Sequence, residues 1–308
     1  MSLLVVGTMA YDSVKTPFGE RHLALGGSAT YFSMSASFFT KVMLVAVIGD
    51  DFAKDHLELL GARGIDMNGV SRLPGCTFHW QGEYGYDLNE AKTLATHLNV
   101  LEKFDPNLPE SYRGAEYVFL ANIDPRLQRK VLDQVKRPRL VACDTMNFWI
   151  HSALPELKKT LEMVDILFIN EGEARMLANT PNMVKAAREI RSMGPRTLVI
   201  KQGEYGALLF HEGEIVSAPA FTLEEVFDPT GAGDTFAGGF MGHVARMGEK
   251  ELTPALLRQA IVVGSAMASF TVEKFSIDRL KDLERREIAE RFRHFKRLTH
   301  FEDLTAEA

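Results

Sequence analysis

The chain has 308 residues, of which 46% are hydrophobic and 25% are charged, a composition typical of soluble globular proteins that bury a large core. Its net charge of −6 argues against a nucleic-acid backbone or an anionic membrane as the main partner. The sequence contains 2 cysteines and no apolar run near the roughly 20 residues of a membrane span, so neither a disulfide framework nor a membrane anchor is expected. These features predict a cytoplasmic protein.

Short apolar segments recur along the chain and are typical of strands buried on both faces of a parallel sheet. Segments whose apolar residues follow helical spacing lie between them. This alternation predicts an α/β protein, a three-layer α/β/α sandwich with a mostly parallel central sheet. The expected strands are residues 3–6, 42–48, 117–120, 140–143, 166–169 and 197–200, and the expected helices between them are 29–39, 53–63, 125–135, 171–177 and 184–193.

The last third of the chain is expected to be mainly helical, with helices at 231–247, 254–270 and 278–298. No internal repeat or long linker divides the sequence. We therefore expect one domain over residues 1–308.

Two segments, at about residues 8–25 and 72–100, interrupt the alternation of strands and helices. The second contains Phe78-His-Trp80-Gln-Gly-Glu-Tyr84-Gly-Tyr86. Aromatic residues that alternate with glycine and polar residues indicate strands that no helix covers. An irregular surface loop is the alternative interpretation.

The most specific motif is Asp228-Pro-Thr-Gly-Ala-Gly-Asp234, which directly precedes residues with helical spacing. The first N–H groups of a helix lack partners within the helix, and the helix dipole favours negative charge near them. Gly231, Ala232 and Gly233 would let a phosphate approach these groups closely. The adjacent Asp234, expected to be ionised, could accept the proton of an attacking alcohol. A glycine-rich turn capped by Asp234 is the alternative interpretation.

This motif resembles the C-terminal signature of the ribokinase-like (PfkB) carbohydrate kinase family, and Leu25-Gly-Gly-Ser-Ala29 resembles the N-terminal signature. The resemblance implies an ATP-dependent kinase that moves the γ-phosphate to a hydroxyl, expected to be primary, of a small sugar-like substrate. It makes Asp234 the base and the amides of Gly231, Ala232 and Gly233 the anion hole. It also implies that the two interrupting segments form a small β lid, a surface through which some members form homodimers.

On the substrate side, the resemblance assigns Asp12 to the substrate hydroxyls and Gly26 and Gly27 to a sharp bend beside the substrate. Tyr31 stands where many members carry an asparagine that contacts sugar hydroxyls, so ribose and fructose are not assigned directly. Tyr31 or Trp80 could stack on a base, which makes a nucleoside kinase of the adenosine type the alternative. A non-catalytic ligand-sensing protein with the same fold is a further alternative, although it would not need Asp234.

Metal sites are implied at two places. Asn170-Glu-Gly-Glu173 follows the expected strand 166–169 and matches a family motif, which implies Mg²⁺ near Glu173, held through water. Capping of the next helix by Asn170 is compatible with that role. Members of the family also bind a monovalent cation such as K⁺ near the anion hole, and here Asp228 and Thr230 are the candidates.

On the nucleotide side, Lys201, Gly203 and Gly206 follow the expected strand 197–200, where open α/β sheets bind ligands. They resemble the loop that contacts the nucleotide in the family, although a plain hairpin turn is the alternative. Gly264 resembles part of the wall beside the adenine. Asp144, at another strand end, loosely matches a family pattern, and its contact to phosphate or substrate is left open.

Overall fold

The computed structural model describes residues 2–302. Within that range, nine strands form one sheet in the order β13-β12-β11-β10-β9-β8-β1-β4-β5, in which every neighbouring pair from β11 to β5 is parallel. The predicted fold class and all six predicted strands are confirmed. The strands are β1 (Ser2–Val6), β4 (Lys41–Ile48), β5 (Asp66–Arg72), β8 (Tyr117–Leu120), β9 (Leu140–Asp144), β10 (Ile166–Asn170), β11 (Thr197–Lys201), β12 (Ala207–His211) and β13 (Glu214–Ala218).

Two apolar cores cover the two faces of this sheet. Along β1 the side chains alternate, so Leu3 and Val5 join one core and Leu4 and Val6 join the other. Helices α1 (Ser28–Ala36), α8 (Ala232–Met247) and α9 (Pro254–Thr271) pack in the first core. The second core contains side chains of α3 (Pro125–Leu132), α4 (Asn147–Ser152), α5 (Leu154–Leu161), α6 (Glu171–Ala178) and α7 (Met183–Arg191).

The C-terminal helix predicted at residues 278–298 is divided in two. Helix α10 covers Asp278–Asp282 and α11 covers Arg285–Leu298. Leu283 is extended (ψ 134°) and only 4% exposed, because its side chain turns into the core. Glu284 then starts α11 with a capping box, in which its N–H donates to Glu287 at 2.9 Å. The prediction of one continuous helix was wrong at this point.

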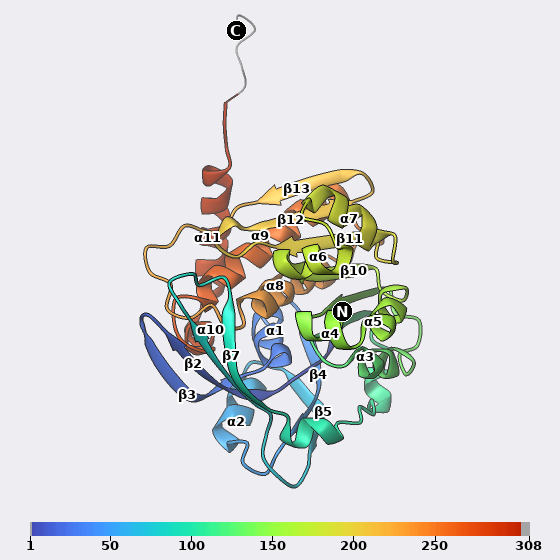
Figure 1. Ribbon diagram of the computed structural model, residues 1–308, viewed down its shortest axis with the longest axis vertical. Helices are drawn as coiled ribbons and strands as arrows, with labels where there is room; N and C mark the ends of the chain where they lie inside the picture. Colours follow the sequence, from blue (N-terminus) through green and yellow to red (C-terminus); the bar gives the residue numbers. More distant parts are fainter. Residues whose placement is uncertain (1, 303–308) are drawn as a thin grey trace, which may run out of the picture.

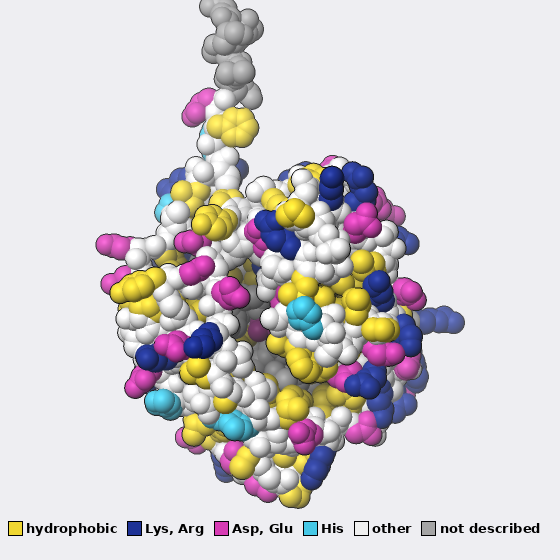
Figure 2. Space-filling model, viewed as in Figure 1, with side chains coloured by type: hydrophobic (Ala, Val, Ile, Leu, Met, Phe, Trp, Pro, Cys, Tyr) yellow, Lys and Arg dark blue, Asp and Glu magenta, His cyan; other side chains and the backbone are white. Residues whose placement is uncertain are grey.

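The two interrupting segments build a second sheet of four strands in the order β3-β2-β6-β7. Its strands are β2 (Ala10–Thr16), β3 (Gly19–Gly26), β6 (His79–Tyr84) and β7 (Ala91–His97). In Figure 1 this sheet lies beside α1 and α2 (Lys54–Ala62), apart from the helices around α5. Figure 2 shows that the molecule is hollowed between these two parts, over α1. None of the helices within residues 2–302 is long and apolar enough to cross a membrane.

Candidate active site

Helix α8 begins directly behind the glycine-rich turn. Gly231 is its N-cap in the left-handed conformation (φ 74°, ψ 0°), and no side chain of the described residues caps the helix. The simple turn capped by Asp234 is therefore wrong, and the first turn is open to an anion. The amide of Ala232 was expected to be free for an anion, but its N–H already donates to the Pro229 carbonyl at 3.1 Å.

Asp234 stands in the first turn of α8 beside a buried ion pair. Lys201, at the end of β11, donates from Nζ to Asp144 Oδ2 at 2.8 Å, and Asp144 ends β9 at 4% exposed. A Cβ built at Gly233 would lie 3.0 Å from Lys201 Nζ, so the ammonium group borders the open helix terminus. The structure thus joins Asp144, whose role the sequence left open, to Lys201 and the α8 terminus.

The pKa of Asp234 is raised to about 7, first because the carboxyl is buried and second because Asp144 repels its charge, while Lys201 lowers it. The expectation of a fully ionised carboxylate is corrected by this burial. A group whose pKa is near neutrality is matched to accepting a proton from an alcohol and releasing it afterwards.

The substrate-side residues predicted from the sequence lie together. A Cβ at Gly26 would lie 1.9 Å from Asp12 Oδ2, so only glycine leaves room for the carboxyl. Gly27 (φ 96°) is the N-cap of α1, and Tyr31 of that helix places its ring against Gly231. The pKa of Asp12 is raised to about 7, mainly by burial and less by the charges of nearby carboxylates, which include Asp234.

Two aromatic residues of β6 face this cluster: Trp80, which the sequence offered as a stacking partner for a base, and Tyr84, which it did not place in the site. Asp12 of β2 is paired with Trp80 of β6, and paired positions on neighbouring strands share one face of a sheet. Tyr84, four residues on, also lies on that face and accepts from Thr230 Oγ1 at 3.3 Å. The alternation of positions 80, 82 and 84 was the available signal for this face.

The carboxyl of Asp228 is 2% exposed and accepts two backbone hydrogen bonds. These come from Thr230 at 2.9 Å and from Ser276 at 3.2 Å. Burial raises its pKa, and the hydrogen bonds act against that shift. Asp228 therefore fixes the turn that leads into α8.

Asn170 and Glu173 form a full capping box at the start of α6, with hydrogen bonds of 2.8 and 2.9 Å. The pKa of Glu173 is raised to about 7 by burial first, then by Asp144, while Lys201 lowers it. Glu173 therefore lies near the Lys201–Asp144 pair. No cluster of three or more His, Cys, Asp or Glu residues suited to a metal occurs within residues 2–302.

The loop after β11 contacts the tip of the second sheet. Glu204 donates its N–H to Asn89 Oδ1 at 3.1 Å, and Asn89 Nδ2 donates to Glu204 Oε1 at 3.3 Å. Gly203 (φ 57°) leaves room for Asn89, and Gly206 (φ 103°) packs against the backbone of Ala218. The turn between β6 and β7 thus bridges the hollow to the predicted nucleotide loop.

Gly264 is the predicted residue that is not brought to this cluster. A Cβ there would lie 2.9 Å from the Phe236 carbonyl oxygen, where α9 crosses α8. Its small size leaves room for this close helix crossing, and its place in a wall beside the adenine stays a prediction.

Comparison with known proteins agrees with this geometry. The sequence model of the "pfkB family carbohydrate kinase" matches residues 4–281. Over 253 residues the chain is 34% identical to a cytidine kinase of Thermococcus kodakarensis, covering 80% of this chain and 89% of that protein. Curated relatives include both nucleoside and sugar kinases.

Solved structures share the fold. A Burkholderia thailandensis nucleoside kinase in complex with inosine has a TM-score of 0.76 at 19% identity, covering 95% of this chain and 97% of that one. An E. coli structure that contains ATP and Mg²⁺ has a TM-score of 0.75 at 17% identity, covering 96% and 99%. The chain belongs to the pfkB family of carbohydrate kinases and is a phosphotransferase enzyme.

Proposed function

We propose that the enzyme transfers the γ-phosphate of ATP to a primary hydroxyl of a sugar-bearing substrate, with Asp234 as the general base. The observation that carries this proposal is the uncapped start of α8, with Asp234 in its first turn and Lys201 beside it. The hydroxyl oxygen attacks the γ-phosphorus, its proton passes to Asp234, and the bond to ADP breaks. The open amides near Gly231 and Gly233 and the ammonium of Lys201 stabilise the negative charge on the moving group.

ATP and Mg²⁺ fit the residues around the α8 terminus. The loop 201–206 lies at the carboxyl end of β11 and would contact the nucleotide, and Glu173 would hold Mg²⁺ through water. When bound, Mg²⁺ neutralises charge on the phosphate oxygens.

A nucleoside is the substrate class that the site supports best. Asp12 would hold sugar hydroxyls, while Trp80 and Tyr84 on the same face of the second sheet offer flat apolar surface to a base. The kinase with 34% identity is named for cytidine. A free sugar remains the second candidate, because it needs Asp12 but not the aromatic side chains.

A panel assay separates these candidates. ADP release would be followed with cytidine, inosine, ribose and deoxyribose as acceptors, and the product identified by mass spectrometry. We expect the highest kcat/KM with a nucleoside. Higher activity with free pentoses would favour the sugar kinase, and no phosphate transfer to any of the four acceptors would contradict both candidates.

The Trp80→Ala variant tests whether Trp80 stacks on the nucleobase of the substrate. Loss of base stacking, worth about 1–3 kcal/mol, should raise the KM for a nucleoside roughly 5- to 150-fold. The KM for a free pentose should stay within about twofold of that of the parent enzyme, since the sugar hydroxyls do not use the indole. Steady-state kinetics on both substrates give the comparison. Tyr86→Ala is the control, because Tyr86 is an aromatic residue of the same hairpin that is 97% exposed.

The pH dependence of kcat/KM tests Asp234 as the general base. Asp234 with a pKa of about 7 is protonated below that pH and cannot accept the proton, so kcat/KM should rise through pH 7 and then level off. Asp144→Asn removes a negative charge that raises this pKa, and the rise should move to lower pH. Glu173→Gln should leave the position of the rise unchanged. An unshifted profile in Asp144→Asn would assign the titration to another group.

The monovalent cation and the homodimer belong to the same proposal. Asp228 and Thr230 would border the cation, and turnover should be higher in KCl than in a tetramethylammonium salt at equal ionic strength.

The second sheet offers a dimer surface, because Phe18, Leu23 and Leu94 expose 53%, 57% and 53% of their area there. Sedimentation equilibrium of the full chain measures the dimer.

A further inference from the structure

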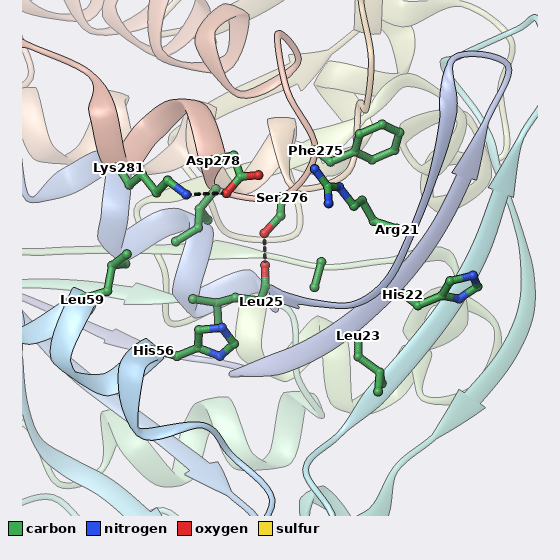
Figure 3. Close-up of a pocket in the computed structure, with 12 residues that line it drawn as sticks. Arg21, His22, Leu23, Leu25, His56, Leu59, Phe275, Ser276, Asp278 and Lys281 are labelled. Carbon is green, nitrogen blue, oxygen red and sulfur yellow. Dashed lines mark hydrogen bonds and ion pairs between the residues drawn. The ribbon is translucent and has the colours of Figure 1, made fainter.

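A second cavity of about 250 Å³ lies outside the candidate active site. It opens between β3, α2 and the segment that runs from the end of α9 into α10 (Figure 3). None of the residues assigned above to catalysis, substrate or nucleotide lines it. The cavity is therefore a separate feature of the surface.

The lining of this cavity carries two cationic side chains, Arg21 and Lys281, and one carboxylate. Lys281 Nζ lies 2.8 Å from Asp278 Oδ1, and Asp278 is the only acidic residue in the lining. Arg21 has no ion-pair partner among residues 2–302, and its guanidinium group points into the space beside Phe275 in Figure 3. The hydrogen bond to Asp278 raises the pKa of Lys281, the charge of Asp282 adds to that rise, and the charge of Arg21 acts against it.

His56 adds an unsatisfied donor or acceptor to the same wall. Its Nδ1 atom is buried and has no hydrogen-bond partner among the described residues. The ring packs against both Tyr11 and Phe52, at centroid distances of 5.8 and 5.7 Å. Because burial lowers its pKa, the ring is neutral near pH 7 and one of its nitrogens carries a proton that can be donated.

Most of the remaining lining is apolar, apart from His22 and Ser276, and the volume of the cavity limits the size of an occupant. Leu25 and Ile277 are 5% and 3% exposed, and Leu59 and Phe275 complete the wall. A cavity of about 250 Å³ is below the usual range for drug-sized ligands, which starts near ~300 Å³. A ligand of this cavity would therefore be small. Its negatively charged group would contact the two cations, and its short carbon skeleton would contact the apolar wall.

We propose that this cavity binds a small phosphate-bearing anion, with Arg21 and Lys281 as its charged contacts and His56 as a neutral hydrogen-bond partner. A phosphate group presents several acceptor oxygens and up to two negative charges. It therefore suits a site with two cations better than a ligand with a single carboxylate group would. The ligand would be a phosphate ester of a short-chain metabolite or free phosphate.

The cavity is connected to the active site through one residue of its wall. Ser276 (φ 58°) donates from Oγ to the Leu25 carbonyl and from its N–H to Asp228 Oδ2 at 3.2 Å. Leu25 directly precedes Gly26, which packs against Asp12. An anion that joins Arg21 to Lys281 would hold β3 against this segment and thereby stabilise both the substrate side and the turn before α8.

Titration calorimetry of the full chain tests the proposal without using catalysis. The probes are glycerol 3-phosphate and inorganic phosphate. The wild-type chain should show a binding event that Arg21→Ala/Lys281→Ala weakens at least tenfold, while any binding at the α8 terminus is the same in both proteins. Lys15→Ala/Lys54→Ala is the matched control, because it removes the same charge from β2 and α2 at positions 61% and 87% exposed.

The outcomes separate the alternatives. Tighter binding of glycerol 3-phosphate than of inorganic phosphate, lost in the cavity variant only, identifies a phosphate ester as the ligand. Equal affinities that are lost in that variant identify free phosphate. Titrations of Arg21→Ala/Lys281→Ala that superimpose on those of the wild type, in a variant with an unchanged circular dichroism spectrum, would overturn the proposal, as would an equal loss in the control. A cavity variant that fails to fold is replaced by Arg21→Gln/Lys281→Gln, to which the same two outcomes apply.

Discussion

Asp234→Asn should lower kcat by about 10²–10⁴-fold, because the amide cannot take the proton from the attacking hydroxyl. Affinity for ATP should stay within about threefold, since the open helix terminus and Lys201 are unchanged. Single-turnover assays with the best acceptor of the panel give the first value, and equilibrium binding of a non-hydrolysable ATP analogue gives the second.

The control for this substitution is Asp55→Asn. Asp55 is also an acidic residue in the first turn of a helix, α2, but its side chain is exposed. Both substitutions remove one carboxylate charge from a helix N-terminus, so their effects on helix stability are comparable. Turnover of Asp234→Asn close to that of Asp55→Asn would remove the residue from the role of base.

Gly231→Ala should abolish most activity and also destabilise the protein. Its φ of 74° is unfavourable for alanine, and the new Cβ would lie 2.4 Å from the Tyr31 ring. Because Tyr31 is 1% exposed, the ring cannot move aside without disturbing the core. Displacement of the turn by even about 1 Å would misplace the amides, so kcat/KM should fall on the order of 10²-fold or more.

Gly64→Ala separates backbone strain from the clash. Gly64 has nearly the same φ (75°) as Gly231, but a Cβ there meets nothing within 4 Å. Thermal unfolding of both variants should show a loss of roughly 1–2 kcal/mol in Gly64→Ala and a larger loss in Gly231→Ala. Equal losses of stability, together with normal kinetics in Gly231→Ala, would contradict a crowded turn.

The sequence predicts the buried strands of this fold because they are continuous apolar runs. It misses β12, an apolar run that follows β11 closely, and also β5 and β13. The polar residues of β5 and β13 reflect their places at the two edges of the sheet, where fewer neighbours cover them. The break between α10 and α11 carries no proline or glycine. It follows instead from the burial of Leu283 and the capping by Glu284, which depend on tertiary contacts.

The candidate site also has a part that local sequence predicts and a part that depends on tertiary structure. The residues around Asp234 are adjacent in the chain, so their arrangement at a helix start can be inferred locally. Lys201, Asp144 and Asp234 come from three distant segments, and only the sheet order brings them together. The contact between Tyr84 and Thr230 spans 146 positions, and no local pattern names the partner of either residue.

The pair of hydrogen bonds between Asn89 and Glu204 has a consequence for the order of events in each cycle. The hairpin that carries Asn89 also carries Tyr84, so the same strand pair contacts both the turn before α8 and the proposed nucleotide loop. In the proposed site, release of ADP or of the phosphorylated product would require this hairpin to open. Product release, rather than phosphate transfer, would then limit kcat. Weakening the contact between Asn89 and Glu204 should therefore raise kcat.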